Sequence, residues 1–229
     1  MGMITCSVCG TGNEDLAITC SSCKSFLQSK VDNLDLFGMM WALMESPRTA
    51  FRKVVLSRHK NYVFLLSSLF GMSLVYSLFW YKTLGSYFSN LLTLIGTGLL
   101  IGPPLGIVFV FLFSSVAVQV ARLLGGKATM RNTFAVVSYA ALPIVLALTC
   151  VFPLELAIFG LDLFGKNPPP IVIKPVVYIA LLGFDVLAFF CSWLLLIEGT
   201  MVANGFTRMK GMLHSVIVIG LAGVCAAIL

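Results

Sequence analysis

The sequence predicts an all-α polytopic membrane protein, in which five transmembrane helices follow a small four-cysteine zinc-ribbon and amphipathic juxtamembrane helices. Composition is the first observation behind this fold class. Hydrophobic residues make up 59% of the 229 residues, charged residues make up 10%, and the mean hydropathy is +1.01, whereas a soluble domain carries about 25% charged residues. The second observation is a repeated CxxC pair near the N-terminus, within the polar part of the chain.

Charge divides the chain into parts. The first 60 residues hold seven of the fifteen Lys and Arg and five of the nine Asp and Glu, and long stretches after Asn61 are nearly free of charge. We therefore expect a zinc-ribbon at residues 1–28, a linker with juxtamembrane helices at 29–60, and a transmembrane domain at 61–229. The net charge of +6 comes without an aromatic-interleaved basic face, so no nucleic-acid partner is expected.

The N-terminal cysteines predict a metal site. Cys6 and Cys9 are separated by two residues, Cys20 and Cys23 repeat this spacing, and ten residues lie between the pairs. Four thiolates in tetrahedral geometry suit one Zn²⁺ ion, and Gly10 supplies the backbone freedom that the first turn requires. Because all four ligands are protein sulfurs, no position is open for water or substrate, and the zinc is predicted to be structural.

Other chemistries for the same cysteines stay open. Two disulfides, a redox CxxC or rubredoxin-like iron would use the same residue type, although a redox CxxC belongs on a thioredoxin-like frame that this sequence does not show. A segment of about 20 residues has little core of its own, so bound metal is expected to supply most of its folding free energy.

Two amphipathic segments precede the first span. Leu34, Phe37, Met40, Trp41 and Met44 recur at helical spacing and would form one apolar stripe. This stripe either lies on the membrane surface or packs on the transmembrane bundle, and the sequence favours neither.

A second helix is expected to start at Ser46-Pro47, with Ser at the N-cap and Pro in the first helical position. It would place Phe51, Val54 and Val55 on one side. The basic residues of this region are predicted to contact a membrane surface with anionic lipids: Arg48, Arg52, Lys53, Arg58 and Lys60.

Hydrophobic runs predict the membrane spans, because a helix needs about 20 apolar residues to cross the hydrocarbon core. A shorter apolar helix or a kinked extension is expected to precede the second of these spans, from Leu91 to Pro104. Five spans are expected: Tyr62–Tyr81, Leu105–Leu124, Phe134–Phe152, Asp185–Val202 and Met212–Leu229.

Proline and glycine mark special positions in and between these spans. Pro143 predicts a kink in the third span, and the triplet at 168–170 predicts an extended, non-helical loop before the fourth. Gly98, Gly102 and Gly106 repeat at intervals of four, which favours close helix packing or a hinge over a permeation pathway.

The basic residues also predict an orientation. Lys and Arg number seven before the first span, three between the second and third, and two between the fourth and fifth, so one side holds twelve against three on the other. The positive-inside rule then places the N-terminus in the cytoplasm and the C-terminus outside, in the cell membrane. A reducing cytoplasm agrees with thiolates held by zinc.

Carboxyl groups inside spans are costly and are candidates for function. Three such residues occur near or within the predicted spans: Glu155, Asp185 and Glu198. Asp185 is expected at the N-terminal end of the fourth span, where the helix dipole favours a carboxylate. Asp185 and Glu198 are the candidate functional residues of a transporter. The sequence has no HExxH or GxSxG motif, and no enzyme activity is expected.

Particular residues resemble a known family. The segment Ser46–Phe51 ahead of the first span is similar to the opening of Yip1-domain proteins. Leu124–Thr129 followed by Phe134–Pro143 resembles the third span of that family, where a Gly-Gly turn and a short polar step precede an apolar helix with Tyr-Ala and Pro. Gly183-Phe184-Asp185, Trp193 and Glu198-Gly199 resemble its fourth-span pattern of Asp, Trp and Gly.

This resemblance implies a five-span membrane protein with a cytoplasmic N-terminal region. Eukaryotic members are associated with vesicle transport and Rab GTPases, but the ribbon resembles the zinc-ribbon of many prokaryotic membrane proteins, so Rab binding is not expected. The expected function is a non-enzymatic scaffold or adaptor in membrane organisation, trafficking or assembly. Its ribbon would dock a protein partner, and a homo-oligomer stays open. The alternative is a small-solute or ion transporter or channel.

Overall fold

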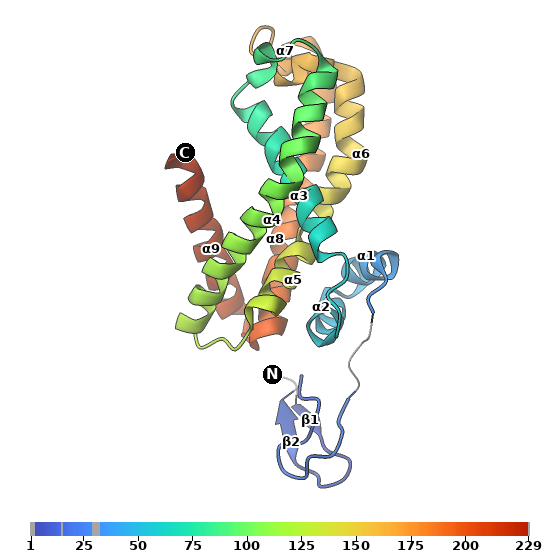
Figure 1. Cartoon of the computed structure of the whole chain (residues 1–229), viewed down its shortest axis with the longest axis vertical. Coiled ribbons are helices and arrows are strands. Elements are labelled where there is room, and N and C mark those ends of the chain that lie inside the picture. The colour runs from blue at the N-terminus through green and yellow to red at the C-terminus, as the bar shows by residue number, and fades with distance from the viewer. Residues whose placement is uncertain (1–2, 15, 29–32, 229) are drawn as a thin grey trace. The chain divides into compact units, whose positions relative to one another are not determined.

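The structure is a computed structural model that describes residues 3–14, 16–28 and 33–228, with side chains as far as residue 223 (Figure 1). Among these residues, β1 (Met3–Thr5) and β2 (Gly12–Glu14) form an antiparallel pair in which Thr5 lies opposite Gly12, and an isolated β-bridge joins Thr19 to Phe26. The helices of the described residues are α1 (Leu36–Glu45), α2 (Pro47–Leu56), α3 (Val63–Tyr81), η1 (Leu84–Tyr87), α4 (Leu91–Leu123), α5 (Met130–Ala140), α6 (Leu142–Phe159), η2 (Gly160–Phe164), α7 (Pro170–Ile173), α8 (Pro175–Asn204) and α9 (Arg208–Ile228).

Four segments are long and apolar enough to cross a membrane: Val63–Tyr81, Leu91–Leu123, Met130–Phe164 and Pro175–Asn204. They correspond to the first four predicted spans. The fifth predicted span corresponds to α9, a helix of 21 residues whose last side chains lie outside the described part of the chain. The polytopic all-α fold class is therefore confirmed.

Three predictions concern segments that contain proline. The apolar run from Leu91 is one continuous helix of 33 residues that contains Pro103 and Pro104, so its first part is an extension of the second span. The kink at Pro143 is confirmed, because α5 ends at Ala140 and α6 starts with Pro143 in its first turn. The triplet of prolines is extended only as far as Pro169, since Pro170 begins the short helix α7.

Contacts divide the chain into two compact units, which we describe separately. The first comprises residues 1–62, 116–136 and 197–229, and the second comprises 63–115 and 137–196.

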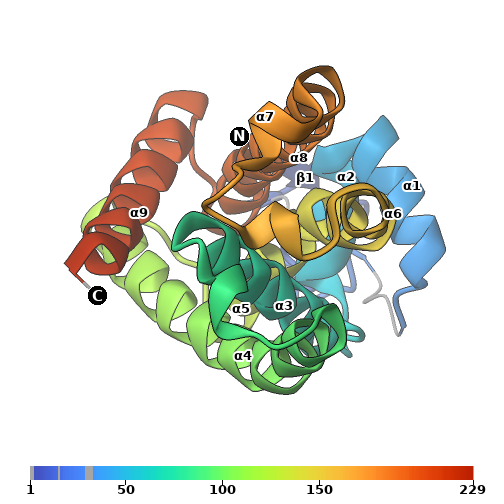
Figure 2. The same cartoon turned by 90° about the horizontal axis from the view of Figure 1, so that it is seen from above.

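The second unit is built on a close crossing of α3 and α4, which lie side by side in Figure 2. A Cβ atom added at Gly106 would lie 2.1 Å from the Ser67 carbonyl oxygen, and one at Gly71 would lie 2.2 Å from the Gly102 carbonyl oxygen. The Tyr76 ring fills the space over Gly98 in the same way. The packing interpretation of the predicted glycine repeat is thus confirmed, because only glycine lets the two backbones approach this closely.

The core of the second unit is aromatic. Tyr76 stacks on Phe152 with ring centroids 4.5 Å apart, and Tyr76 Oη donates to the Ile95 carbonyl at 2.9 Å. Residues from α3, α4, α6, η2 and α8 form its buried cluster: Val75, Tyr76, Phe79, Leu94, Phe159, Leu163, Phe164 and Leu181.

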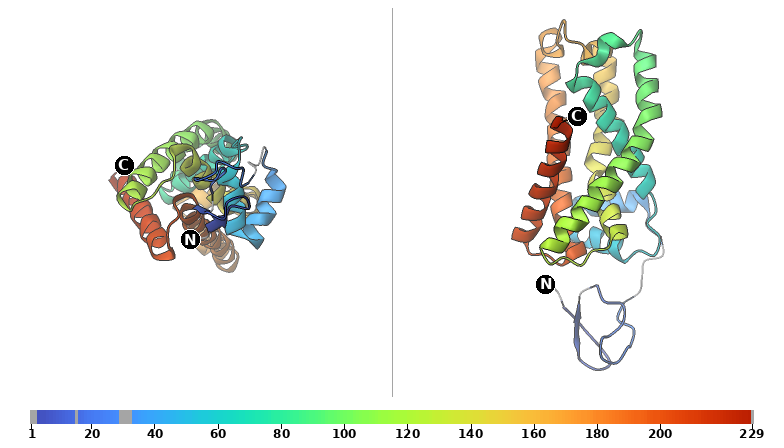
Figure 3. Two further views of the ribbon diagram at one scale, coloured as in Figure 1. Left: turned by 90° about the horizontal axis from the view of Figure 1, so that it is seen from below. Right: turned by 60° about the vertical axis from the view of Figure 1, so that its left-hand side comes forward.

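In the first unit, α9 lies beside the C-terminal end of α4 (Figure 3). His214 is buried, and its Nε2 lies 2.9 Å from the Ala117 carbonyl oxygen. The Lys210 ammonium donates to the Leu124 carbonyl at 3.1 Å. His214 is therefore a packed residue with a backbone partner.

Three of the segments that resemble Yip1-domain proteins meet in this unit. Phe51 of α2 is fully buried, and a Cβ atom added at Gly199 of α8 would lie 2.9 Å from the Phe51 ring. The Gly-Gly turn has Gly125 at φ +80°, and Asn204 Oδ1 accepts the Ala128 N–H at 3.1 Å just after it. These motifs therefore mark contacts between helices.

Candidate metal centre and buried carboxyl pair

The four N-terminal cysteines form one cluster. Their ligand atoms all lie within 4.8 Å of one another. Cys6 Sγ lies 3.6 Å from Cys23 Sγ, and Cys9 Sγ lies 3.5 Å from Cys20 Sγ. A disulfide has sulfurs about 2.05 Å apart, whereas a tetrahedral zinc with Zn–S bonds of about 2.3 Å has sulfurs about 3.8 Å apart. The geometry therefore fits a metal site.

Two equivalent backbone turns bring these sulfurs together. The Gly10 N–H donates to the Cys6 carbonyl at 2.9 Å, and the Lys24 N–H donates to the Cys20 carbonyl at 3.2 Å. A second matched pair closes each turn, since Cys6 N–H bonds the Thr11 carbonyl at 3.0 Å and Cys20 N–H bonds the Ser25 carbonyl at 2.8 Å. The two CxxC segments are thus repeats of one local structure, which the equal cysteine spacing predicted.

Asn13 and Ser25 support the cluster and were not predicted. Asn13 is buried, and its Oδ1 accepts the Ser21 N–H at 2.8 Å while its Nδ2 lies 3.5 Å from Cys20 Sγ. Ser25 Oγ lies 3.0 Å from both Cys6 Sγ and Cys23 Sγ. Neither residue has a sequence signal, because their role depends on the fold of one CxxC turn against the other.

Hydrogen bonding also makes two of these cysteines better ligands. The hydroxyl of Ser25, followed by the backbone N–H groups of Cys9 and Val8, lowers the pKa of the Cys6 thiol to about 6. The pKa of Cys20 is likewise lowered, chiefly by the backbone N–H of Cys23. Because the thiolate is the form that binds metal, these bonds favour metal binding.

The carboxyls of the predicted spans are arranged differently from the sequence prediction. Asp185 lies well inside α8, which begins ten residues earlier at Pro175, so its predicted place at the start of a helix is wrong. Its side chain lines the same cavity as that of Glu155 of α6. Glu198 belongs to the first unit and faces Arg48 of α2, with Arg48 Nε and Glu198 Oε2 3.9 Å apart. The partner of Asp185 at this cavity is therefore Glu155, whereas the sequence predicts Asp185 and Glu198 as the functional candidates.

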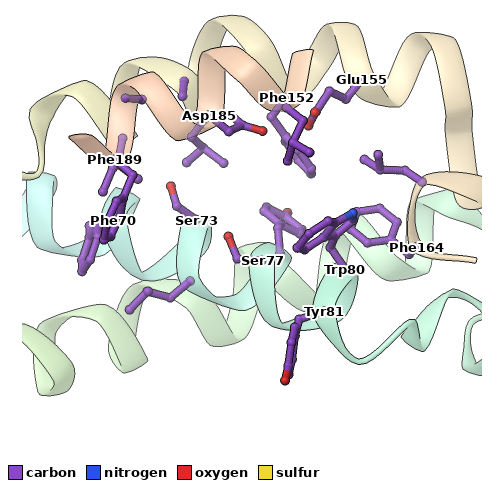
Figure 4. Close-up of a pocket in the computed structure, with 18 of the residues that line it drawn as sticks. Phe70, Ser73, Ser77, Trp80, Tyr81, Phe152, Glu155, Phe164, Asp185 and Phe189 are labelled. Atoms are coloured by element: carbon purple, nitrogen blue, oxygen red, sulfur yellow. The ribbon is translucent and has the colours of Figure 1, made fainter. Parts of the chain in front are cut away.

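The Glu155–Asp185 pair lies on a cavity of about 450 Å³ in the second unit. Figure 4 shows both carboxyls directed into the cavity from α6 and α8, with Ser73 and Ser77 of α3 across from them. Much of the remaining lining is aromatic: Phe70, Tyr76, Trp80, Tyr81, Phe152, Phe164, Tyr178 and Phe189. The cavity is thus an apolar space with one acidic side.

The predicted surface cations have mixed surroundings. Lys53 and Arg58 are exposed, and Arg52 Nη2 donates to Gln28 Oε1 at 3.1 Å. Lys60 donates to the carbonyls of Val54 and Val55, the latter at 2.9 Å. Lys60 thereby bonds carbonyls at the C-terminal end of α2, where the Val54 carbonyl also accepts the Ser57 hydroxyl at 2.9 Å.

Fold and site together define a multi-pass α-helical membrane protein with an N-terminal four-cysteine cluster that can form a zinc-ribbon. The profile of the Yip1 domain matches residues 41–229, and the chain belongs to the Yip1 domain family. This match confirms the resemblance seen in the sequence, and it includes α2 and part of α1 ahead of the first span. Comparison with curated proteins and with solved structures found no match.

Proposed function

We propose that this protein is a non-enzymatic scaffold or adaptor in membrane organisation, trafficking or assembly, and that its ribbon holds one structural Zn²⁺ and docks a protein partner. The single observation that carries this proposal is the closed set of four sulfurs, which leaves a tetrahedral metal no open position for water or substrate. A metal held in this way stabilises a surface and performs no chemistry.

The surface of the ribbon supports the docking role. Met3, Val8 and Phe26 are exposed by 78%, 72% and 65%, although a ribbon this small has few apolar residues. Exposed apolar side chains on a rigid module are typical of sites that bind other proteins.

Site-specific photo-crosslinking tests the docking role in native membranes. A photoreactive residue at Val8 or Phe26 should give one discrete protein adduct, which disappears in the Cys20→Ser variant. Tyr87 of η1 is a matched control, because it is 82% exposed but lies outside the ribbon. No adduct from either ribbon position, or one that persists without zinc, would contradict the proposal. Metal analysis should find one zinc per chain. Wild-type protein purified without zinc would contradict the proposal that the ribbon holds a structural Zn²⁺ ion.

For orientation, we propose the cell membrane with the N-terminus in the cytoplasm and the C-terminus outside. Cysteines introduced at Ser46 and Tyr87 lie on opposite sides of the first span, α3. A membrane-impermeant maleimide should label Tyr87→Cys in intact cells and Ser46→Cys only after permeabilisation. The reverse pattern would overturn the orientation.

The segment before the first span is proposed to contact anionic lipids through Arg48, Arg52, Lys53, Arg58 and Lys60. Apolar residues of α1 support this role, since Phe37, Trp41 and Met44 form a stripe that is 77%, 70% and 78% exposed. Met39 and Leu43 form the buried face of the same helix. An exposed apolar stripe beside basic residues is typical of helices that lie in a membrane interface.

A second candidate function is transport of a small solute or ion. The observation that favours it is the Glu155–Asp185 pair on its cavity, because carboxyls inside a membrane domain commonly mark transport pathways. Flux into liposomes that depends on Asp185 and Glu155 but not on Glu198 would support transport. Absence of flux for a broad set of solutes would leave the scaffold as the function.

A further inference from the structure

The Glu155–Asp185 cavity has features of a binding site for a particular class of ligand. We infer that it binds a monovalent organic cation, an ammonium group attached to an apolar body. This inference names a ligand for the site of the second candidate function. It requires binding alone, so a protein that does not transport the ligand would still fit it.

Charge is the first reason. Glu155 is only 8% exposed, and none of the described residues that line the cavity is Lys, Arg or His. Glu155 and Asp185 both line this apolar cavity, and two carboxylates in one such site repel each other, so we expect the pair to share one proton. A pair with one shared proton carries a single negative charge. Because an uncompensated charge in an apolar site is costly, a single positive charge is the complementary ligand.

The aromatic lining is the second reason. Trp80 Nε1 donates to Tyr178 Oη at 3.2 Å, which ties α3 to α8 at the cavity. Tyr76 is held by its hydrogen bond to Ile95 and by stacking on Phe152. Rings fixed in this way attract an ammonium group through their π faces, most strongly when the group has left water.

The same lining disfavours a metal ion. Hard cations such as Ca²⁺ or Mg²⁺ take about six or more oxygen ligands. The cavity offers the two carboxyls and a few hydroxyls, and the Ser73 hydroxyl already donates to the Leu69 carbonyl at 3.3 Å. A ligand that exposes carbon to the rings and one charge to the carboxyls fits better. The volume of about 450 Å³ is of the size that small-molecule sites have.

The test uses the full-length protein in lipid nanodiscs and two probes of the same shape. Benzyltrimethylammonium carries the charge, and 2,2-dimethylpropylbenzene replaces the charged nitrogen by carbon. Calorimetric titration should show saturable binding of the cation, about tenfold or more tighter than binding of the neutral compound. Equal binding of the two probes, or no saturable binding of the cation, would overturn the inference.

Variants connect this selectivity to the named residues. Glu155→Gln combined with Asp185→Asn should remove the preference for the cation, whereas Glu198→Gln is a matched control outside the cavity and should keep it. Because the double variant can fail to fold, Trp80→Leu provides a second measurement at a partly exposed position. It should lower the ratio of cation to neutral binding severalfold. A ratio unchanged by Trp80→Leu, or by a folded double variant, would contradict the site.

Discussion

Gly10 and Lys24 occupy equivalent positions in the metal centre, each directly after one CxxC pair, and both have a left-handed backbone. Their φ angles are +71° and +59°. The repeat of the turn therefore imposes the same backbone on a glycine and on a lysine. Only the glycine adopts it without steric cost.

Replacing Gly10 by Ala should weaken zinc binding about tenfold. Nothing lies within 4 Å of a Cβ atom added there, so the whole effect comes from the left-handed backbone, which costs an alanine roughly 1–2 kcal/mol. Because folding of a ribbon and metal binding are coupled, competition with a chromophoric chelator measures this cost. Gly10→Asn should lose less zinc affinity than Gly10→Ala, since Asn tolerates this conformation. Lys24→Gly should not weaken zinc binding. Wild-type affinity in Gly10→Ala would show that the turn is not needed.

Removing the Ser25 hydroxyl should make zinc binding more sensitive to acid. Its hydrogen bond is the leading cause of the lowered pKa of Cys6, which keeps that thiolate unprotonated down to about pH 6. Ser25→Ala raises this pKa, so protons should displace zinc at a higher pH than in the wild type. Zinc release followed with an indicator during acid titration measures the midpoint, and Ser22→Ala, at an exposed position in the same turn, is the control. An unshifted midpoint would rule out this role for Ser25.

A methyl group at Gly106 should disrupt the crossing of α3 and α4. The added Cβ would lie 2.1 Å from a backbone oxygen and 2.5 Å from the Gly71 Cα, and neither backbone atom can move away cheaply. We expect the free energy of unfolding to fall by about 3 kcal/mol, at the upper end of the usual cost of overpacking. Thermal unfolding in detergent is the measurement. Gly96→Ala on the same helix is the control, because nothing lies within 4 Å there and stability should be kept or slightly increased. Equal effects of the two substitutions would contradict the crossing.

The exposed stripe of α1 should insert into lipid. Fluorescence of Trp41 should be quenched by brominated acyl chains in vesicles that contain anionic lipid, after Trp80 and Trp193 are replaced by Phe. Replacing Lys53 and Arg58 by Gln should reduce the quenching, because exposed basic residues near an anionic surface each contribute about 1 kcal/mol. If Trp41 is not quenched in the protein that keeps Lys53 and Arg58, the stripe packs against protein instead of inserting into lipid.

The four-cysteine cluster was the part most readily predicted from sequence. The four cysteines lie in two short repeats, and the spacing predicts that each pair of sulfurs converges. The contributions of Asn13 and Ser25 could not be predicted, because a hydrogen bond from β2 to the second CxxC turn depends on how the strand pair is placed. The sequence therefore predicted the cysteines themselves, but not the hydrogen bonds that other residues make to them.

The transmembrane part was predicted in outline. Hydrophobic length predicted the number and order of the long helices, but the predicted fourth span begins at Asp185, whereas α8 begins ten residues earlier at Pro175. The predicted position of Asp185, at the start of its helix, was therefore wrong. Its partner Glu155 is on another helix, and no periodicity in a single sequence connects the two.

The ion pair of Arg48 and Glu198 has a consequence for biosynthesis. Its two residues are 150 positions apart, one ahead of the first span and the other near the end of α8. The contact can form only after α8 has been synthesised and inserted. Arg48 of α2 therefore has no Glu198 partner until all four long apolar segments have been made. Arg48 and Glu198 therefore form a late contact, and its closure would report that a newly made chain has assembled.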